Sequence, residues 1–154
     1  MLPSFIDRAP SGKEEGSVIA LDIGGSTMRV ALIKLNPTAN SVADRLKVER
    51  KQQWLIEQCV KELYADRFFD WIAQNVKTFF ENQGMTIDGE LSSIPLGLVW
   101  SFPLDQKMLN DGELKDMGKG FRVGLDLKGK SINACLSAAF ERLVRLARMQ
   151  LRFS

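Results

Sequence analysis

The hydrophobic pattern of the first fifty residues predicts three strands. Two apolar runs, residues 18–23 and 30–35, flank a turn that is rich in glycine and hydroxyl side chains. We therefore expect strands at about residues 18–22 and 28–35, joined as a hairpin. Residues 42–48 alternate loosely between apolar and polar positions, which predicts a third strand with one exposed face. Short turns join all three strands, so they should be antiparallel.

The middle of the chain changes to a helical period. Apolar side chains recur at helical spacing between residues 69 and 80, with Asp66 as the candidate cap and Gly84 as the candidate stop. Residues 94–103 are almost continuously apolar, as in a strand that is covered on both faces. Because a helix separates this strand from the earlier ones, we expect the connection to be parallel.

A small hairpin and a second helix follow. The pair Asp111-Gly112 is a strong hairpin signal, and we expect it to form the turn. Residues 117–121 should form a flexible loop with one cation, Lys119. The last predicted element is a helix that begins near Ser131. The predicted order is strand, strand, strand, helix, strand, a small hairpin and a helix, which is an α/β fold with a mixed sheet.

Composition describes an ordinary globular chain with one domain. The chain has 154 residues, 45% hydrophobic and 26% charged, and residues 1–16, rich in glycine, proline and charge, are expected to form a leading loop. A net charge of +2 does not indicate nucleic acid, and no apolar stretch is long enough to span a bilayer. No secretory signal is recognised, and Cys59 and Cys135 are predicted to be buried thiols, so we expect a cytoplasmic location.

The sequence contains no histidine. Ser-His-Asp catalysis, zinc sites with histidine ligands and acid–base chemistry by imidazole are therefore excluded within these residues. Any proton transfer has to use a carboxylate, a lysine or a tyrosine.

The turn between the first two predicted strands is the main candidate for chemistry. Gly24 and Gly25 allow a ligand to approach the backbone closely. The hydroxyls of Ser26 and Thr27 can face phosphate oxygens, and Asp22 is placed to hold a metal ion or its waters. Neither G-x-x-x-x-G-K-[ST] nor G-x-G-x-x-G is present. On local grounds alone, the segment is better explained as an ordinary hairpin turn.

Several motifs, taken in order, resemble the hexokinase family of ATP-dependent sugar kinases. The turn is similar to the family's Leu-Asp-Leu-Gly-Gly-Thr-Asn, and the resemblance runs almost from end to end. The matching segments are residues 1–5, 10–16, 21–30, 95–97, 101–103, 110–114 and 118–121. Motifs in register are far more specific than one Gly-Gly pair, so they favour a phosphate-binding turn over an ordinary hairpin.

The resemblance implies an actin-like ATPase fold, related to ribonuclease H, in which residues 1–154 are the small lobe, incomplete at both ends. It implies transfer of the γ-phosphoryl group of ATP to a hexose, with Mg²⁺, as in the phosphorylation of glucose to glucose 6-phosphate at the start of glycolysis. The residues that it implies at the ATP phosphates are Asp22, Gly24, Gly25, Ser26, Thr27, Arg29 and Lys47, with Asp22 holding the metal through water. The implied hexose contacts are Ser101, Phe102 and Lys119.

The sequence also departs from the family's pattern. Gly118 stands where the family has a sugar-binding threonine, and Thr27 stands where it has an asparagine. The family's proton-accepting aspartate, which follows an asparagine after the second helix, has no counterpart in residues 1–154. We therefore expect no catalytic base and no turnover by this chain alone, with a large lobe missing. A non-catalytic sugar-sensing module and an inert remnant are the alternatives.

Overall fold

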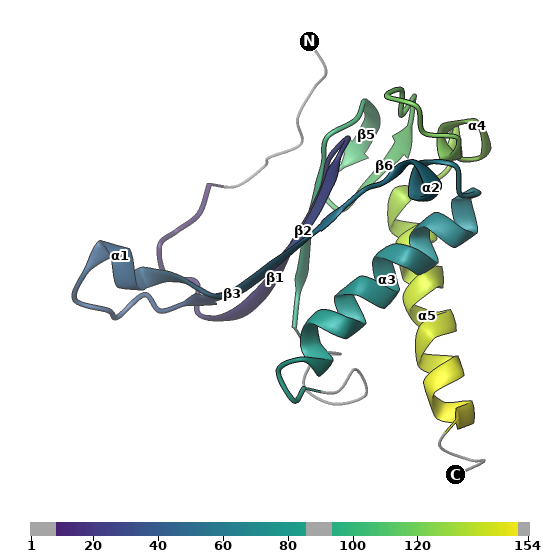
Figure 1. Ribbon diagram of the computed structural model, residues 1–154. Coiled ribbons are helices and arrows are strands. Elements are labelled where there is room, and N and C mark those ends of the chain that lie inside the picture. Colours follow the sequence, from purple (N-terminus) through teal and green to yellow (C-terminus); the bar gives the residue numbers. More distant parts are fainter. Residues whose placement is uncertain (1–8, 86–93, 151–154) are drawn as a thin grey trace.

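The computed structural model describes residues 9–85 and 94–150 and confirms the α/β class (Figure 1). The elements are, in order, β1 (Gly16–Ile23), β2 (Thr27–Leu35), α1 (Val42–Arg45), β3 (Leu46–Leu55), α2 (Gln58–Lys61), α3 (Ala65–Glu81), β4 (Leu96–Trp100), β5 (Leu104–Met108), β6 (Asp111–Leu114), α4 (Val123–Leu127) and α5 (Ile132–Gln150). The two long helices, α3 and α5, lie side by side, and an ion pair between Arg142 and Asp70, 2.7 Å apart, joins them.

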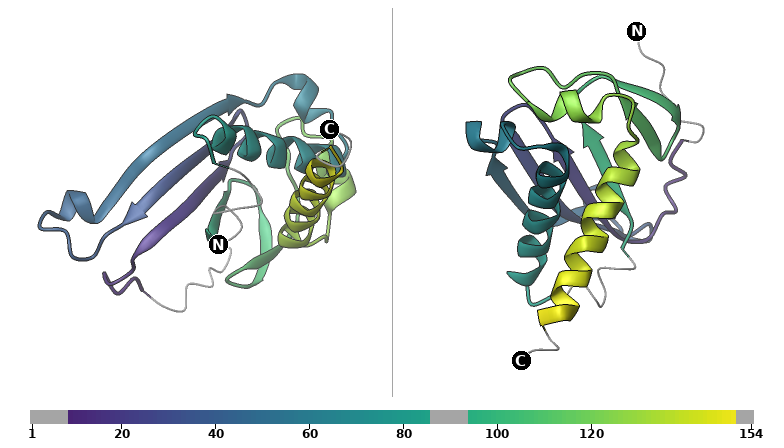
Figure 2. Two further views of the ribbon diagram at one scale, coloured as in Figure 1. Left: turned by 90° about the horizontal axis from the view of Figure 1, so that it is seen from below. Right: turned by 90° about the vertical axis from the view of Figure 1, so that its right-hand side faces the viewer.

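Four strands form the main sheet in the order β3-β2-β1-β4. β1 pairs with β2, and β2 with β3, in antiparallel ladders, whereas β4 lies parallel to β1. This arrangement confirms the antiparallel start and the later parallel connection that the sequence predicts. Both long helices lie on the same face of the sheet (Figure 2). The strands β5 and β6 form a separate small sheet.

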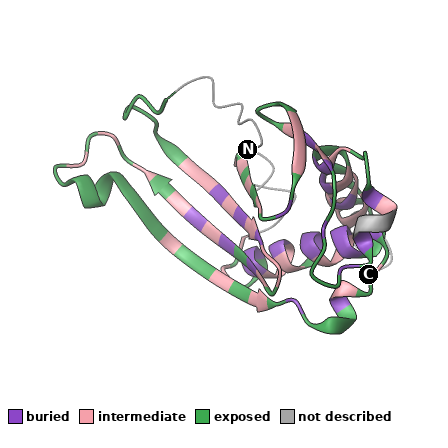
Figure 3. Cartoon of the chain, turned by 90° about the horizontal axis from the view of Figure 1, so that it is seen from above, coloured by how far each residue is buried: buried purple, intermediate pink, exposed green. Residues whose placement is uncertain are grey.

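Alternation along β1 and β2 places every second side chain in the core (Figure 3). In β1, the buried residues Ile19, Leu21 and Ile23 belong to the same apolar cluster as the stripe of α3. Every residue of the predicted stripe is buried, namely Phe69, Ile72, Ala73, Val76, Phe79 and Phe80. Burial of one large apolar side chain stabilises the fold by about 1.5–3 kcal/mol, so this stripe is the main attachment of α3 to the sheet.

The two ends of α3 differ in how well the sequence identifies them. Gly84 is confirmed as the stop, because its φ is +72° and its amide donates to the Glu81 carbonyl, while the following amide donates to Phe80. This is the Schellman arrangement, which favours glycine at the left-handed position. Asp66 is not the cap. The cap position belongs to Tyr64, and Asp66 lies in the first turn, where its charge complements the helix dipole.

The strand predicted at residues 42–48 begins later than expected. Val42–Arg45 form the short helix α1, because the Ser41 hydroxyl accepts a hydrogen bond from the Ala43 amide at 3.1 Å and caps the turn. The strand β3 therefore starts at Leu46 and extends to Leu55. Local capping by serine competes with the strand pattern, and here the cap prevails.

Three predictions elsewhere need correction. β4 is not covered on both faces, because exposed residues alternate with half-buried ones along it and Val99 is 57% exposed. The hairpin turn lies at residues 109–110, just before the pair at 111–112, which belongs to β6. Cys59 is exposed rather than buried, whereas Cys135 is half-buried, and burial raises the pKa of its thiol.

Candidate functional site

Three residues, Gly24, Gly25 and Ser26, form the turn that joins β1 to β2. The Gly24 amide donates to the Thr27 carbonyl at 2.9 Å, which closes the turn around Gly25 and Ser26. The Ser26 carbonyl accepts a hydrogen bond from the Ile56 amide at 2.8 Å, so the segment after β3 holds the turn in place. Gly25 and Ser26 stand outside the strand ladder, and their amides are therefore free to bind a ligand rather than the sheet.

The side chain of Lys119 lies directly against this turn. A Cβ atom placed on Gly25 would lie 2.6 Å from Cδ of Lys119 and 3.4 Å from its Nζ. A Cβ contact of 2.6 Å does not occur without displacement, so the close approach of Lys119 depends on glycine at position 25. The fold thus brings the predicted turn and the predicted cation together from distant parts of the chain.

The end of β4 also lies beside the Gly25 turn. The Ser101 amide donates to the Ile23 carbonyl at 3.0 Å, which fixes Ser101 beside the last residue of β1. Phe102 is buried, and Nζ of Lys119 lies 5.0 Å from the centroid of its ring, within the range of a cation–π contact. Ser101 itself is exposed. The turn, Ser101 and Lys119 therefore border one region of the surface.

An aromatic cluster positions the loop that carries Lys119. Phe121 packs edge-on against Phe68 and Phe102, with ring centroids 5.7 and 5.2 Å away. Nζ of Lys61 donates to the Lys119 carbonyl at 3.4 Å, a contact that joins positions 58 residues apart and has no local sequence signal. Lys119 has a φ of +50°, which is uncommon outside glycine and concentrates at functional sites.

The same loop borders a hollow of about 530 Å³. Its lining includes three lysines, Lys115, Lys119 and Lys128, and one acid, Asp116. An excess of positive charge in a concave surface attracts anions. This hollow belongs to the Lys119 loop, and none of its lining residues lies in the Gly25 turn.

Asp22 and Arg29 are cross-strand partners beside the turn. Nη1 of Arg29 lies 2.8 Å from Oδ2 of Asp22, and both side chains are partly exposed, so the pair stabilises the fold by at most about 1 kcal/mol. Within the residues that the structure describes, no group of three or more His, Cys, Asp or Glu side chains is arranged to hold a metal ion. Asp22 is the carboxylate beside the turn that would hold the waters of a Mg²⁺ ion, since Mg²⁺ usually keeps several waters and binds beside phosphates through one or two carboxylates.

The structure separates Lys47 from the other predicted phosphate-binding residues. Lys47 pairs with Lys34, whereas Thr27, at the turn, pairs with Leu55 at the opposite end of β3. A strand rises by about 3.3 Å per residue, so Lys47 lies roughly 25 Å along the sheet from the turn. The predicted placement of Lys47 at the ATP phosphates is therefore corrected. The register of β3, which starts only after α1, carries Lys47 to the far end of the sheet.

Asp111 has a structural role. Its Oδ1 accepts hydrogen bonds from Ser131 Oγ at 2.8 Å, from the Gly112 amide at 2.8 Å and from the Asn133 amide at 3.4 Å. Burial raises the pKa of this carboxyl, but the three hydrogen bonds outweigh burial and hold the pKa below its usual value. Asp111 thus ties β6 to the start of α5.

Two neighbouring acids also have structural partners. Oδ1 of Asp116 accepts a hydrogen bond from the Gly118 amide at 3.1 Å, within the loop before Lys119. Oδ1 of Asp105 lies 3.8 Å from Nζ of Lys115. These contacts account for both carboxylates as parts of the loop and hairpin framework.

Comparisons with known proteins identify the family. The family model described as Hexokinase matches residues 1–151. N-acetylglucosamine kinase 1 of Candida albicans is 33% identical over 138 residues, which cover 88% of this chain and 27% of that protein. Hexokinase-like 1 protein of Arabidopsis thaliana is 33% identical over 143 residues, which cover 92% and 28%. The structure of hexokinase from Schistosoma mansoni complexed with glucose aligns with a TM-score of 0.74 and 28% identity, over 92% of this chain and 30% of that one.

The chain belongs to the hexokinase family, as the resemblance of its motifs predicts. The likeness to solved hexokinases also confirms the actin-like ATPase fold. The chain spans between a quarter and a third of the length of these relatives, from 27% to 32% in the comparisons above and in a second hexokinase structure. Among the described residues, no helix combines the length and the apolar character needed to cross a membrane.

Proposed function

We propose that this chain acts as the small lobe of a hexose kinase, which transfers a phosphoryl group from ATP to a sugar hydroxyl. The observation that supports the proposal most is the contact of Lys119 with the Gly25 turn, next to Ser101. A phosphate-binding turn and two sugar-binding side chains then share one region of the lobe. Phosphoryl transfer requires this proximity, because its catalysis consists mainly of positioning and charge stabilisation.

In this proposal, the turn holds the triphosphate. The amides of Gly25 and Ser26 face phosphate oxygens, and the hydroxyls of Ser26 and Thr27 are further donors. Asp22 would hold a Mg²⁺ ion through the waters of the ion, which would supply positive charge to neutralise the phosphates. The ion pair with Arg29 holds the Asp22 carboxylate in place.

The sugar, a hexose such as glucose, lies against Ser101 and Lys119. A hydroxyl both donates and accepts hydrogen bonds, and an ammonium group donates to sugar oxygens, so the pair suits a neutral polyol. The reaction is the phosphorylation of glucose to glucose 6-phosphate, at the first step of glycolysis in the cytoplasm. Asp105, Asp111 and Asp116 have structural partners, so we propose none of the three as the proton acceptor.

A non-catalytic sugar-binding module is the second candidate, and Gly118 favours it. The φ of Gly118 is +51°, a conformation in which threonine is strained, so exchange of this glycine does not simply restore the threonine that the family places there. Loss of one sugar hydrogen bond weakens binding by about 0.5–1.5 kcal/mol. Weak sugar binding without turnover is the behaviour expected of such a module.

Calorimetry with Mg-ATP and with glucose tests the proposal, using two matched glycine variants. Gly25→Ala places a methyl group against Lys119 and displaces it, and we expect Mg-ATP to bind at least about tenfold more weakly. Gly97→Ala is the control, because the nearest atom to its new methyl is the Ile19 carbonyl oxygen at 3.8 Å, an ordinary contact. Equal affinity of both variants for Mg-ATP would refute a phosphate site at the turn.

A coupled assay for ADP release separates the two candidates from an inert remnant. We expect Mg-ATP to raise the melting temperature of the chain by mass action, and we expect no turnover with glucose. Turnover by the chain alone would contradict our account of the missing base. Binding of glucose without any binding of Mg-ATP would favour the sugar-binding module, and binding of neither would identify a remnant.

A further inference from the structure

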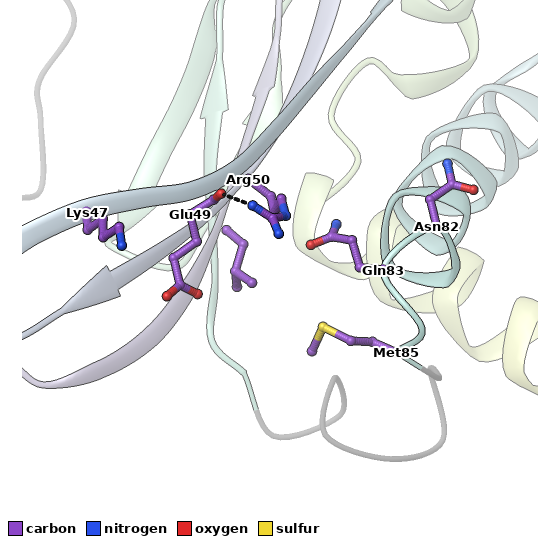
Figure 4. Close-up of a pocket in the computed structure, with 7 residues that line it drawn as sticks. Lys47, Glu49, Arg50, Asn82, Gln83 and Met85 are labelled. Atoms are coloured by element: carbon purple, nitrogen blue, oxygen red, sulfur yellow. Dashed lines mark hydrogen bonds between the residues drawn. The ribbon is translucent and has the colours of Figure 1, made fainter.

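A second polar hollow lies at the far end of the sheet from the Gly25 turn. It has a volume of about 540 Å³ and opens between β3 and the end of α3 (Figure 4). Its lining residues are Leu32, Lys47, Glu49, Arg50, Asn82, Gln83 and Met85. Small-molecule sites commonly occupy about 300–1,000 Å³, so the hollow has room for a ligand of the size of a sugar phosphate.

A β-bulge builds one wall of this hollow. Arg50 pairs with Leu32 and Val48 pairs with Ile33, so Glu49 is an extra residue on β3. Without a bulge, residues 47 and 50 would point to opposite faces of the strand, because side chains alternate. The bulge places Lys47, Glu49 and Arg50 on the same side, and all three line the hollow. Bulges are common at the edges of sheets, where β3 lies, and next to active sites, where they redirect a side chain.

The groups around the hollow offer both donors and acceptors. Nη1 of Arg50 donates to the Glu49 carbonyl at 3.1 Å, and the guanidinium keeps further donors for a ligand. Nε2 of Gln83 donates to the Phe79 carbonyl at 2.7 Å, which leaves its Oε1 as the acceptor. Figure 4 shows the Arg50 guanidinium and the Gln83 amide facing each other across the hollow. In the part of the chain that the structure describes, no ion pair neutralises Lys47 or Arg50.

We infer that this hollow binds a small phosphate ester at a site separate from the Gly25 turn. Arg50 and Lys47 hold the phosphoryl group, since a guanidinium fork and an ammonium ion are the side chains that best match phosphate oxygens. Glu49 and Gln83 accept hydrogen bonds from hydroxyls on the rest of the ligand. Arg50 also complements the dipole at the end of α3, but that role needs neither Lys47 nor the bulge.

Amide NMR of the ¹⁵N-labelled chain tests the inference at constant ionic strength, with inorganic phosphate and glycerol 3-phosphate as probes. Both carry the phosphoryl group, but only the ester carries hydroxyls for Glu49 and Gln83. We expect saturable shifts at residues 47–50 and 82–85, with millimolar or tighter affinity and with the ester binding more tightly. Tighter binding of inorganic phosphate than of the ester would overturn the assignment of Glu49 and Gln83 as hydroxyl acceptors.

Variants with matched controls separate this site from non-specific charge and from the turn. Arg50→Gln and Lys47→Gln should each weaken ester binding by about tenfold or more. Lys51→Gln removes the same charge from the neighbouring position opposite Ala31 and should leave the affinity unchanged. Gly25→Ala should also leave it unchanged. An equal loss in Lys51→Gln, or shifts confined to residues 24–27 and 119, would overturn the inference whether or not the turn binds ATP.

Discussion

The hydrogen bonds of Asp111 predict a measurable loss of stability when its side chain is removed. Asp111→Ala deletes one acceptor that serves Ser131 Oγ and the amides of Gly112 and Asn133. Hydrogen bonds to a charged group contribute about 1.5–3 kcal/mol. Ser131 keeps its other bond, from the Ala134 amide at 2.9 Å, so the helix cap itself survives. We therefore expect the free energy of unfolding to fall by about 2 kcal/mol.

Thermal and urea unfolding at neutral pH provide the assay. In a domain of this size, 1 kcal/mol corresponds to about 2–4 °C, so the melting temperature of Asp111→Ala should fall by about 4–8 °C. Asp105→Ala is the matched control, because its carboxylate lies on the same hairpin but has only an exposed ion pair with Lys115. Exposed pairs contribute about 0–1 kcal/mol, so the melting temperature of this variant should be close to that of the wild-type chain.

The stability difference between the wild-type chain and Asp111→Ala should also depend on pH in a definite direction. The folded-state pKa of Asp111 is lowered, so its contribution to stability is fully present above the unfolded pKa, about 4, and is lost as the pH falls through the folded value. The difference between the unchanged chain and Asp111→Ala should therefore shrink in acid. A cost below about 0.5 kcal/mol at neutral pH, or a cost that persists undiminished at the lowest pH, would refute the reasoning.

Further predictions concern the exposure of the two cysteines, the packing of α3 in the core and the cap at the C-terminal end of α3. Cys59 should react with a thiol reagent faster than Cys135, because Cys59 is exposed and burial raises the pKa of the Cys135 thiol; equal rates would contradict the described packing. Phe69→Ala should destabilise the fold by about 3–5 kcal/mol in urea unfolding, since Phe69 is 1% exposed, and a cost near zero would show that α3 packs otherwise. Gly84→Ala should cost about 1 kcal/mol in the same assay, because its φ is +72°; a gain in stability would contradict the Schellman cap.

The sequence predicts most of the main sheet and the course of α3, because those elements depend on local periodicity. The turn at Gly24 and Gly25 and the stripe from Phe69 to Phe80 are both visible in short windows of residues. Where the predicted elements are wrong, a local side-chain hydrogen bond competes with the pattern. Ser41 caps a helical turn where alternation indicates a strand, and Asp111 binds Ser131 instead of forming the hairpin turn. Competition between a side-chain hydrogen bond and a propensity is not decided by spacing alone.

The geometry of the candidate site could not be predicted from the sequence for a different reason. Family resemblance identifies Lys119 as a candidate site residue. It does not show that the Lys119 side chain lies against Gly25, where an added Cβ would be 2.6 Å from its Cδ, because that contact depends on tertiary packing. The support from Lys61 and Phe121 is equally non-local. The prediction that places Lys47 at the phosphates is wrong for a related reason. The position of a residue along a strand depends on the strand's register, and α1 and the bulge at Glu49 change the register of β3.

A double-mutant cycle between Gly25 and Lys119 tests the central claim most directly, with the Mg-ATP affinity as the measured quantity. In our proposal Lys119 contacts the sugar, but its ammonium group also lies against the turn, where its charge attracts the bound phosphates. Gly25→Ala, which displaces Lys119, should therefore weaken Mg-ATP binding in the wild-type chain but have little further effect in Lys119→Met. We therefore predict a coupling energy of about 1 kcal/mol or more between the two positions. Strictly additive effects, or no saturable Mg-ATP binding by the unchanged chain, would contradict a shared site.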